Sequence, residues 1–346
     1  MKAFIEKLRD REDLHSSDVS YAVSMLLSEQ TPREEKAAFL TALHEKGETA
    51  EEITAFVQQL IDRSVDPMID PKRLPGPLLD VCGTGGAGLG LFNVSTTIMF
   101  MLAAGGAVVV KHGNRGVTSA SGSADVLEAL GVRINCEPDE LMKGLSEMGL
   151  AFIFARQYHP AFRMIAEIRE QLAYAKTRTI FNLLGPLLNP ARPPRQLIGV
   201  YEARLTTVFA EVLRRLKRER AWVVHGSTDG GAGMDNISIS GATTLAELEN
   251  GKVTSAVLDT RWLGVTGASV AELRGGDATE NAATLLGILG GELQGPKRDL
   301  ALVNAAGGFV VSGLVHDLGD GIALARETIE SGRAMQKLRA LQQLSA

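Results

Sequence analysis

The sequence predicts an α/β protein in which a small all-helical N-terminal domain precedes a large α/β domain with a mostly parallel central sheet. The first sign is the spacing of apolar residues near 3.6 in residues 18–27 and 34–43, which is typical of amphipathic helices. The second is a change after residue 78, where short apolar runs alternate with helical segments, as in strand–helix–strand units. A chain of 346 residues is long enough for both domains.

The bulk composition narrows the functional class. With 45% hydrophobic and 22% charged residues, the chain has the composition of a soluble globular protein. A net charge of −5 counts against nucleic-acid binding, although a local basic cleft stays open. Two cysteines suit a reducing cytoplasm, and neither a signal-peptide core nor an apolar run long enough for a bilayer is present. We therefore expect a cytoplasmic protein without a membrane partner.

The N-terminal helices carry recognisable start signals. Thr31 and Pro32 suit the cap and the first position of one helix, and Thr49 with Glu52 opens the next. Residues 66–77 contain four prolines and are expected to form a linker.

The domain boundaries follow from these patterns. We place the helical domain at residues 1–70, joined by helices from about 160–192, and the α/β domain at residues 78–159 and 193–346. The expected strands are residues 78–81, 107–110, 132–135, 151–154, 197–200, 221–225 and 253–258. The helices expected among and after them include residues 96–104, 124–130, 138–148, 205–216, 299–312 and 319–331.

Two glycine-rich turns each follow a predicted strand. The first runs from Cys82 to Gly88 and the second from Lys111 to Gly116, and Asn93 offers a cap side chain ahead of the helix between them. Glycine lets a backbone approach a ligand closely, and the amides at a helix start point at anions. This stretch is therefore interpreted as a phosphate cradle.

Other glycine-turn classes fit less well. Gly83, Gly85 and Gly88 have the spacing of a dinucleotide-binding turn, but residues 105–110 lack the acidic residue that such a fold needs. A nucleotide-hydrolase loop would need Gly-Lys-Ser/Thr, which is absent here.

The residues that accompany the turns favour phosphate binding. Lys111 is a point charge at a strand end, with Asn114 and Arg115 close behind it. Nearby hydroxyl donors are Ser95, Thr96, Thr118, Ser119, Ser121 and Ser123. Taken singly, these serines are also consistent with caps and turns, and the two cations with ordinary surface charges.

Several longer motifs occur in one order along the chain: DVCGTGGAGLGLFNVST from Asp80, KHGNR from Lys111, SGSADVLEALG from Ser121 and RTIFNLLGPL from Arg178. They resemble the motifs of the anthranilate phosphoribosyltransferase family, and the resemblance extends over essentially the whole chain. It implies transfer of phosphoribose from phosphoribosyl pyrophosphate (PRPP) to the amine of anthranilate in tryptophan biosynthesis. It also implies a homodimer, a Mg²⁺ cofactor and an oxocarbenium-like transition state, with no covalent nucleophile.

The resemblance also implies a set of site residues. PRPP would be bound by Gly83, Thr84, Gly85, Gly86, Asn93, Ser95, Thr96, Lys111, Ser119 and Ser123. Anthranilate would lie along Gly83, Asn114, His159, Arg169 and Gly185, with the Arg169 guanidinium facing the carboxylate, a pairing that its planar fork suits. Magnesium would be held by Ser95, Asp235 and Asn236. His159 is equally consistent with a cap on the helix that follows it.

Departures from the family pattern fall in functional motifs. Ala87 stands where an acidic residue is usual, and Asn236 replaces one carboxylate of an Asp-Glu pair, so we expect weakened metal binding. Residues 170–177 form a longer segment than usual, and Ala120 replaces a residue that is commonly basic.

These departures keep other functions open. One is a related enzyme with another aromatic acceptor, or a phosphorolytic relative, which the KHGNR motif disfavours. Another is a non-catalytic relative that binds a phosphorylated ligand or nucleic acid, and the acidic balance counts against the latter.

Overall fold

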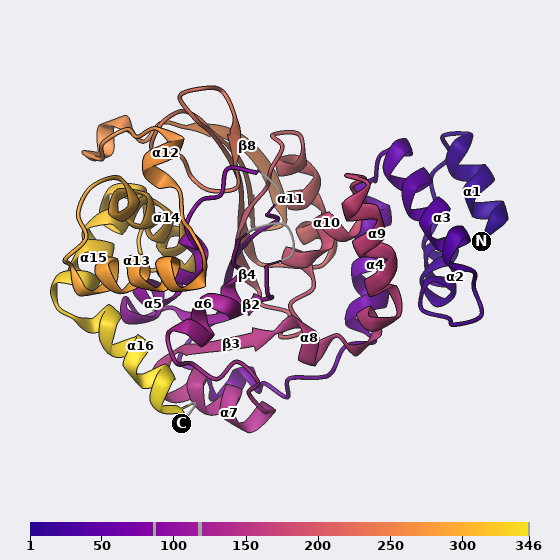
Figure 1. Cartoon of the computed structure of the whole chain (residues 1–346). Helices are drawn as coiled ribbons and strands as arrows, with labels where there is room; N and C mark the ends of the chain where they lie inside the picture. Colours follow the sequence, from indigo (N-terminus) through magenta and orange to yellow (C-terminus); the bar gives the residue numbers. More distant parts are fainter. Residues whose placement is uncertain (86–87, 117–119, 345–346) are drawn as a thin grey trace. The chain divides into compact units, whose positions relative to one another are not determined.

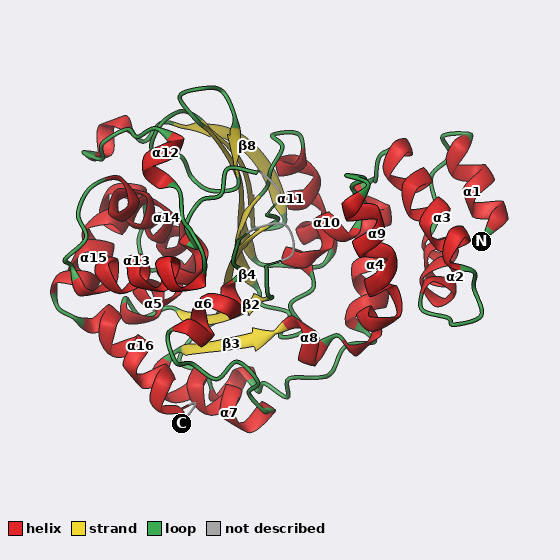
Figure 2. Ribbon diagram, in the orientation of Figure 1, coloured by secondary structure: helices red, strands yellow, loops and turns green. Residues whose placement is uncertain are grey.

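The computed structural model describes residues 1–85, 88–116 and 120–344, and the chain divides into two compact units (Figure 1). The first unit comprises Met1–Asp66 and Arg156–Pro190, and the second comprises Pro67–Ala155 and Ala191–Ala346. Figure 2 shows helices in the first unit and a sheet with helices in the second. The predicted fold class is confirmed.

The first unit is built around short helices with local caps. They are α1 (Lys2–Arg9), α2 (Ser16–Leu26), α3 (Arg33–Lys46), α4 (Ala50–Ile61), α8 (Ala155–Tyr158), α9 (Ala166–Tyr174) and α10 (Phe181–Leu184), with 3₁₀ turns at Pro160–Ile165 and Gly185–Leu187. Thr49 accepts a hydrogen bond from the Glu52 amide, and the Glu52 carboxylate accepts one from the Thr49 amide at 2.9 Å. The predicted capping box is confirmed. Helix α3 begins one residue later than predicted, at Arg33, without a side-chain cap from Thr31.

The sheet of the second unit contains β1 (Leu78–Gly83), β2 (Val108–Gly113), β3 (Leu150–Phe154), β4 (Arg195–Gly199), β5 (Arg220–Ser227), β6 (Gly233–Met234), β7 (Thr243–Glu249) and β8 (Lys252–Leu258). Its order is β3-β2-β1-β4-β5-β7-β8, with β6 beside β5. The first five strands of this order run parallel, whereas β6, β7 and β8 pair antiparallel. Strands β2 and β3 lie on one side of β1, whereas β4 and β5 lie on its other side. Ligands of such sheets bind where the order switches, here between β1 and β4.

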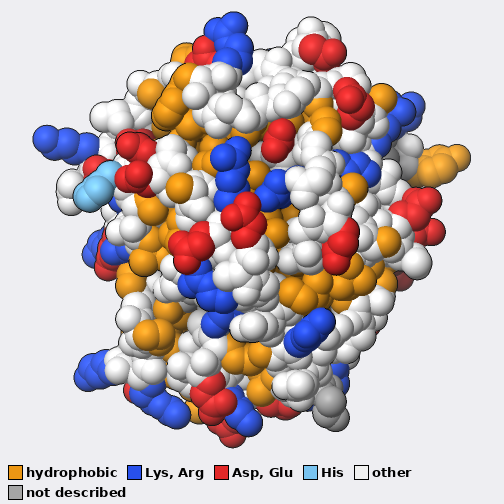
Figure 3. All heavy atoms as spheres, turned by 90° about the vertical axis from the view of Figure 1, so that its left-hand side faces the viewer, with side chains coloured by type: hydrophobic (Ala, Val, Ile, Leu, Met, Phe, Trp, Pro, Cys, Tyr) orange, Lys and Arg blue, Asp and Glu red, His pale blue; other side chains and the backbone are white. Residues whose placement is uncertain are grey.

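The helices of the second unit are α5 (Val94–Ala104), α6 (Ser123–Ala129), α7 (Pro138–Lys143), α11 (Leu205–Arg215), α12 (Val270–Leu273), α13 (Ala278–Gly290), α14 (Pro296–Ser312), α15 (Leu318–Glu330) and α16 (Arg333–Leu344). On the face shown in Figure 3, basic and acidic side chains are interspersed with apolar ones. Among the described residues, no helix is both long and apolar enough to cross a membrane.

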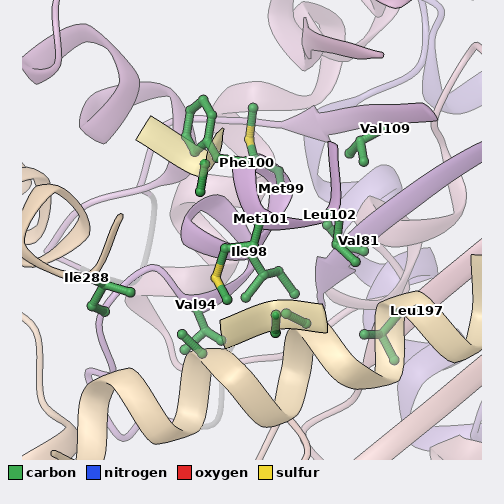
Figure 4. Packing of buried hydrophobic residues seen from close by; sticks show 14 of the residues in the cluster. Val81, Val94, Ile98, Met99, Phe100, Met101, Leu102, Val109, Leu197 and Ile288 are labelled. Atoms are coloured by element: carbon green, nitrogen blue, oxygen red, sulfur yellow. The ribbon is translucent and has the colours of Figure 1, made fainter. Parts of the chain in front are cut away.

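Helix α5 lies inside the hydrophobic core (Figure 4). Its side chains are buried from Thr96 to its end, and they pack with Val81, Val109 and Leu197 of the sheet. A Cβ at Gly308 of α14 would lie 2.7 Å from Leu102 of α5, so these two helices approach closely. The core therefore fixes the position of the α5 N-terminus.

Several elements differ from the sequence prediction: the helix predicted at residues 138–148 is α7 followed by a π-helical segment at Gly144–Met148, and three strand assignments change. The predicted strand at residues 132–135 is wrong: these residues are an irregular segment in which Val132 and Ile134 are buried without joining the sheet. Apolar and polar residues alternate here because one side of the segment is buried. An extended loop can have this pattern as well as a strand. Strands β6 and β7 were not predicted, and in β7 the alternation of buried and partly exposed residues is broken because Leu245 and Ala246 are both buried.

Candidate active site

Both glycine-rich turns lie at the carboxyl edge of the sheet. Strands β1 and β2 are parallel neighbours, so the turns that follow them leave the same edge. Gly83 of β1 and Gly199 of β4 are register partners at this edge. A Cβ at Gly83 would lie 2.6 Å from Asp235 Oδ2, and one at Gly199 would collide with the Asp235 carbonyl. The glycine pair therefore makes room for Asp235 at the switch point between β1 and β4.

The amides of the first turn bond to the protein itself. Thr84 N donates to the Gly199 carbonyl at 2.9 Å, and Gly85 N donates to Asp235 Oδ2 at 2.8 Å. Gly86 and Ala87 lie outside the described residues. Thr84 Oγ1 is buried and has no hydrogen-bond partner in the described part of the chain.

Unpaired donors are found instead at the start of α5. Asn93 occupies the N-cap position, but its side chain does not cap the helix. Within the described ranges, the amides of Ser95 and Thr96 have no acceptor, and Thr96 Oγ1 is buried without a partner. The first amides of a helix carry partial positive charge and bind anions when nothing caps them. This helix start is therefore suited to a phosphate.

Lys111 connects the two turns to α5. Its side chain is 2% exposed, and its Nζ donates to the Val81 carbonyl at 2.6 Å and to Ser95 Oγ at 3.0 Å. Burial lowers the pKa of Lys111, and the Asp80 carboxylate opposes that shift. A buried ammonium beside open helix amides adds positive charge to the same anion site.

The second turn is held by Asp125 of α6. The Asp125 carboxylate accepts from the amides of Gly116 and Gly122, each at 2.8 Å, and from Arg115 Nη1 at 3.1 Å. Arg115 also pairs with Glu128, so its charge is used within the protein.

Asn114 offers a polar group from the same turn. Its Oδ1 accepts from the Arg115 amide at 2.8 Å, and its carbonyl accepts from Ser123 Oγ at 3.4 Å. Its side-chain nitrogen has no acceptor among the residues that the structure describes. Ser119, predicted in this loop, lies outside them.

In the first unit, His159 is held in place by its neighbours. Its Nε2 donates to the Leu188 carbonyl at 2.7 Å, and its ring stacks on Phe162 at 5.3 Å between centroids. Its side chain does not cap the following turn, so the alternative interpretation as a helix cap is wrong. Burial lowers the pKa of His159, which favours the neutral ring.

Arg169 of α9 lies between two aromatic rings. Its guanidinium carbon is 5.9 Å from the ring centroid of Phe162 and 5.4 Å from that of Phe181. Burial and then the nearby Arg156 charge lower the pKa of Arg169, and no hydrogen bond or ion pair to it occurs among the described residues. A guanidinium stacked on rings keeps its planar fork available for a carboxylate. A Cβ at Gly185, in the same unit, would meet nothing within 4 Å.

Asp235 and Asn236 follow β6 at the sheet edge. Burial raises the pKa of Asp235, and the hydrogen bond from the Gly85 amide opposes that shift. Asn236 Nδ2 donates to Asp235 Oδ1 at 3.4 Å.

Comparison with known proteins identifies the family. Residues 2–64 match the helical bundle domain of a glycosyl transferase family, and residues 75–335 match its α/β domain. The chain is 43% identical to the anthranilate phosphoribosyltransferase of Petrotoga mobilis over 97% of this chain and 94% of that protein. The chain belongs to the anthranilate phosphoribosyltransferase family.

Solved structures of anthranilate phosphoribosyltransferases are also similar to this chain. The anthranilate phosphoribosyltransferase of Thermus thermophilus superposes with a TM-score of 0.88 at 35% identity, over 99% of this chain and 98% of that one. The enzyme of Saccharomyces cerevisiae, in complex with PRPP and Mg, gives a TM-score of 0.85 at 25% identity, over 99% and 97% of the two chains.

The residues present fit the magnesium that this family uses, as an ion shared with the substrate. Mg²⁺ prefers oxygen ligands and often takes one or two carboxylates together with substrate phosphates and water. Asp235 supplies one carboxylate, and Asn236 supplies an amide oxygen. Ser95 already accepts a hydrogen bond from the Lys111 ammonium, which disfavours a second cation on that oxygen. Among the described residues, no group of three or more His, Cys, Asp or Glu side chains could hold a metal.

The structure gathers the predicted residues in two places, one in each unit. The described residues at the carboxyl edge of the sheet are Gly83, Thr84, Gly85, Asn93, Ser95, Thr96, Lys111, Asn114, Ser123, Asp235 and Asn236. The residues of the first unit are His159, Arg169 and Gly185. Sequence reasoning missed Asp125, Phe162 and Phe181. The spacing from Gly122 to Asp125 is a helix-start signal that points to the first, whereas nothing in the sequence alone places two rings on Arg169.

Proposed function

We propose that this chain transfers phosphoribose from PRPP to the amine of anthranilate, releasing pyrophosphate, as a step of tryptophan biosynthesis. The family relationship supports the reaction class, since the similar curated proteins are anthranilate phosphoribosyltransferases. The observation that carries the proposal is the open α5 N-terminus beside the buried Lys111, because it supplies fixed positive charge for a diphosphate.

The reaction needs stabilisation of the leaving group. The bond between the sugar C1 and the pyrophosphate oxygen breaks, and its electron pair leaves with pyrophosphate. The amides of Ser95 and Thr96 and the Lys111 ammonium are aimed at that developing charge before the bond breaks, which is the most effective form of electrostatic catalysis. The lone pair of the anthranilate nitrogen forms the new C–N bond, and the nitrogen then loses a proton.

The acceptor is recognised by its carboxylate and its ring. The Arg169 fork can make two parallel hydrogen bonds to a carboxylate, which fixes the orientation of a planar acid. Phe162 is half-buried and stacks on the buried, neutral His159, and it supplies apolar surface for the aromatic ring. No side chain is required as a covalent nucleophile, because positioning and leaving-group stabilisation supply the rate.

Magnesium, when bound, neutralises part of the diphosphate charge. We propose that Asp235 and Asn236 hold it together with phosphate oxygens and water. Ser95, the third predicted ligand, then acts mainly through its contact with Lys111.

We further propose the organisation in which the enzyme acts. We place the helical domain at residues 1–70 with 160–192 and the α/β domain at residues 78–159 and 193–346. The division into two compact units, Met1–Asp66 with Arg156–Pro190 and Pro67–Ala155 with Ala191–Ala346, supports this placement. The enzyme is a cytoplasmic homodimer whose partners are small substrates rather than nucleic acid. The net charge of −5 and the mixed charges in Figure 3 support the last point.

A steady-state assay with a panel of acceptors tests this function. With PRPP and Mg²⁺ saturating, we expect turnover with anthranilate and none with aniline, which lacks the carboxylate. Turnover with another carboxylated aromatic amine and none with anthranilate would instead support the alternative acceptor. Absence of turnover with every acceptor would reject the proposal.

A further inference from the structure

The cap residue of α5 points away from its own helix. Asn93 Oδ1 accepts a hydrogen bond from Ser121 Oγ at 3.3 Å, and Asn93 Nδ2 donates to the Ser121 carbonyl at 3.5 Å. An asparagine at this position normally accepts from the second or third amide of the helix. Here that interaction is absent, and the amides of Ser95 and Thr96 lack acceptors among the described residues.

The Ser121 hydroxyl is oriented by a residue far away in the sequence. Asn281, in the first turn of α13, is 4% exposed, and its Nδ2 donates to Ser121 Oγ at 2.8 Å. The same amide group closes two further bonds with Gly276, one from Asn281 Nδ2 to the Gly276 carbonyl and one from the Gly276 amide to Asn281 Oδ1, each at 3.0 Å. Ser121 Oγ thus accepts from Asn281 and donates to Asn93, so one hydroxyl links the two side chains.

Backbone contacts keep this relay in register. Gly275 N donates to the Gly90 carbonyl at 2.8 Å, and Leu91 forms an antiparallel bridge with Arg274. A Cβ at Gly275 would lie 2.7 Å from the Phe92 Cα, so the two segments are in direct contact. The segment before α13 therefore docks onto the segment before α5, and Asn281 is fixed relative to Asn93.

We propose that Asn281 is a positioning residue of the diphosphate site. Through Ser121 it holds the side chain of Asn93 off α5, and it thereby keeps the Ser95 and Thr96 amides open for a phosphate. This inference rests on the proposed function in one respect: the phosphate that binds these amides belongs to PRPP or pyrophosphate.

The expected effect follows from competition for the same amides. Without the relay, Asn93 turns back and caps α5, and a phosphate must displace it. Displacing one cap interaction corresponds to about a fivefold loss of affinity. The effect falls on PRPP and pyrophosphate, whereas anthranilate binding is unchanged.

The test is an Asn281→Asp variant of the full chain. It keeps the oxygen that accepts from the Gly276 amide but replaces the nitrogen that donates to Ser121. Thr279→Asp is the matched control, because Thr279 is an exposed residue in the same helical turn and receives the same added charge. Ser121→Ala is the second variant, since it removes the relay hydroxyl with little change in volume.

The measurements are the dissociation constant of pyrophosphate with Mg²⁺ by calorimetry and the KM of each substrate. We expect Asn281→Asp and Ser121→Ala each to weaken pyrophosphate binding about fivefold and to raise the KM of PRPP equally, without changing the KM of anthranilate. The double variant is expected to lose no more than either single variant, because both break one relay. Thr279→Asp is expected to behave like the wild type.

Two outcomes would overturn the inference. One is wild-type pyrophosphate affinity in both Asn281→Asp and Ser121→Ala. The other is an equal loss in Thr279→Asp, which would show an effect of charge alone. A wild-type chain that binds pyrophosphate but does not turn over anthranilate contradicts the proposed function instead. In that case the ratio of the pyrophosphate dissociation constants of Asn281→Asp and the wild type still tests the role of Asn281.

Discussion

At the scale of single residues, Arg169 is held by aromatic rings, which leaves its hydrogen-bond donors available. Phe162 and Phe181 lie within 6 Å of its guanidinium carbon, and no carboxylate among the described residues pairs with it. Aromatic faces attract a cation without consuming its hydrogen-bond donors. A carboxylate pair would have occupied those donors before the substrate arrived.

The first prediction concerns this arginine. Arg169→Lys removes the bidentate fork and is expected to raise the KM of anthranilate about tenfold or more, because hydrogen bonds to charged groups contribute about 1.5–3 kcal/mol. Phe181→Leu removes one ring and should raise the same KM by a smaller factor. Steady-state kinetics with PRPP saturating measures both. Arg163→Lys, at an exposed position nearby, is the control, and an unchanged KM for anthranilate in Arg169→Lys contradicts the assignment.

The second prediction concerns the charge of Lys111. Because burial lowers its pKa, Lys111 loses its proton at a lower pH than an ordinary lysine, whose pKa is 10.5. Pyrophosphate affinity should therefore fall as the pH rises toward that value. Lys111→Met should bind at least about tenfold more weakly at neutral pH, since it lacks a charge-assisted contact.

A pH series of dissociation constants checks this sign. Lys143→Met, at an exposed position, is the control for removing a lysine, and it also shows how the titration of pyrophosphate itself affects the curve. We expect the loss of pyrophosphate affinity at alkaline pH to be smaller in Lys111→Met than in Lys143→Met. Parallel curves in the two variants would mean that Lys111 does not titrate in the site.

The sequence indicated candidate site residues more readily than it indicated the residues to which they hydrogen-bond. Lys111 was predicted as a phosphate contact because it ends a strand and opens a glycine-rich turn, and the family resemblance implied that the phosphate is that of PRPP. Its bonds to Val81 and Ser95 depend on how β1, β2 and α5 pack, which local spacing does not encode. Arg115, a candidate from the same turn, is instead paired with Asp125 and Glu128.

At the scale of elements, the ends of β1 and β4 determine where Asp235 lies. Gly83 and Gly199 face each other in register, and a side chain on either would meet Asp235. The ends of β1 and β4 thus contact the loop that carries Asp235, which lies 150 residues after Gly85 in the chain. Such a contact could not be predicted from spacing, because the two partners come from distant segments.

The third prediction tests this packing. Gly199→Ala forces Asp235 away from the sheet edge and is expected to lower the free energy of unfolding by about 1–3 kcal/mol, the usual effect of overpacking. It should also raise the Mg²⁺ concentration needed for activity. Urea denaturation and a magnesium titration measure the two effects. Gly230→Ala, where a Cβ would meet only Thr228 Oγ1 at 4.0 Å, is the control, and equal stability of the two variants would contradict the packing argument.

The fourth prediction concerns Asp235 and Asn236, the proposed metal ligands in the loop after β6. Asn236→Glu adds a carboxylate beside Asp235 and is expected to lower the Mg²⁺ concentration for half-maximal activity about tenfold. Thr279→Glu adds the same charge at an exposed site and should leave the titration unchanged. An identical magnesium curve for Asn236→Glu and the wild type would show that residue 236 is not a ligand.

The elements also show where periodicity misleads. Residues 132–135 have the alternation of a strand, yet they lie outside the sheet because their burial is satisfied by packing alone. Strand β7 has a less regular pattern, with Leu245 and Ala246 both buried, and it does join the sheet, antiparallel to β5. Burial alone therefore does not identify a strand, because a segment joins the sheet only where a neighbouring strand edge is available.

At the scale of the whole molecule, the fold class was predictable because helical and strand periodicities occupy separate stretches of the chain. The helical first unit and the parallel core of the second unit both follow from that pattern. The arrangement of the candidate site was less predictable. The proposed diphosphate-binding residues belong to the second unit and His159, Arg169 and Gly185 to the first, and the contacts of each set depend on packing within its own unit.

The central claim is that the diphosphate leaves as the anthranilate nitrogen bonds to the sugar, without a covalent enzyme intermediate. The most direct test measures pyrophosphate release and anthranilate consumption together, with Mg²⁺ and PRPP in excess. We predict one pyrophosphate for each anthranilate consumed and no release when anthranilate is omitted. Release of pyrophosphate without anthranilate, in a burst equal to the enzyme concentration or continuously, would contradict the account.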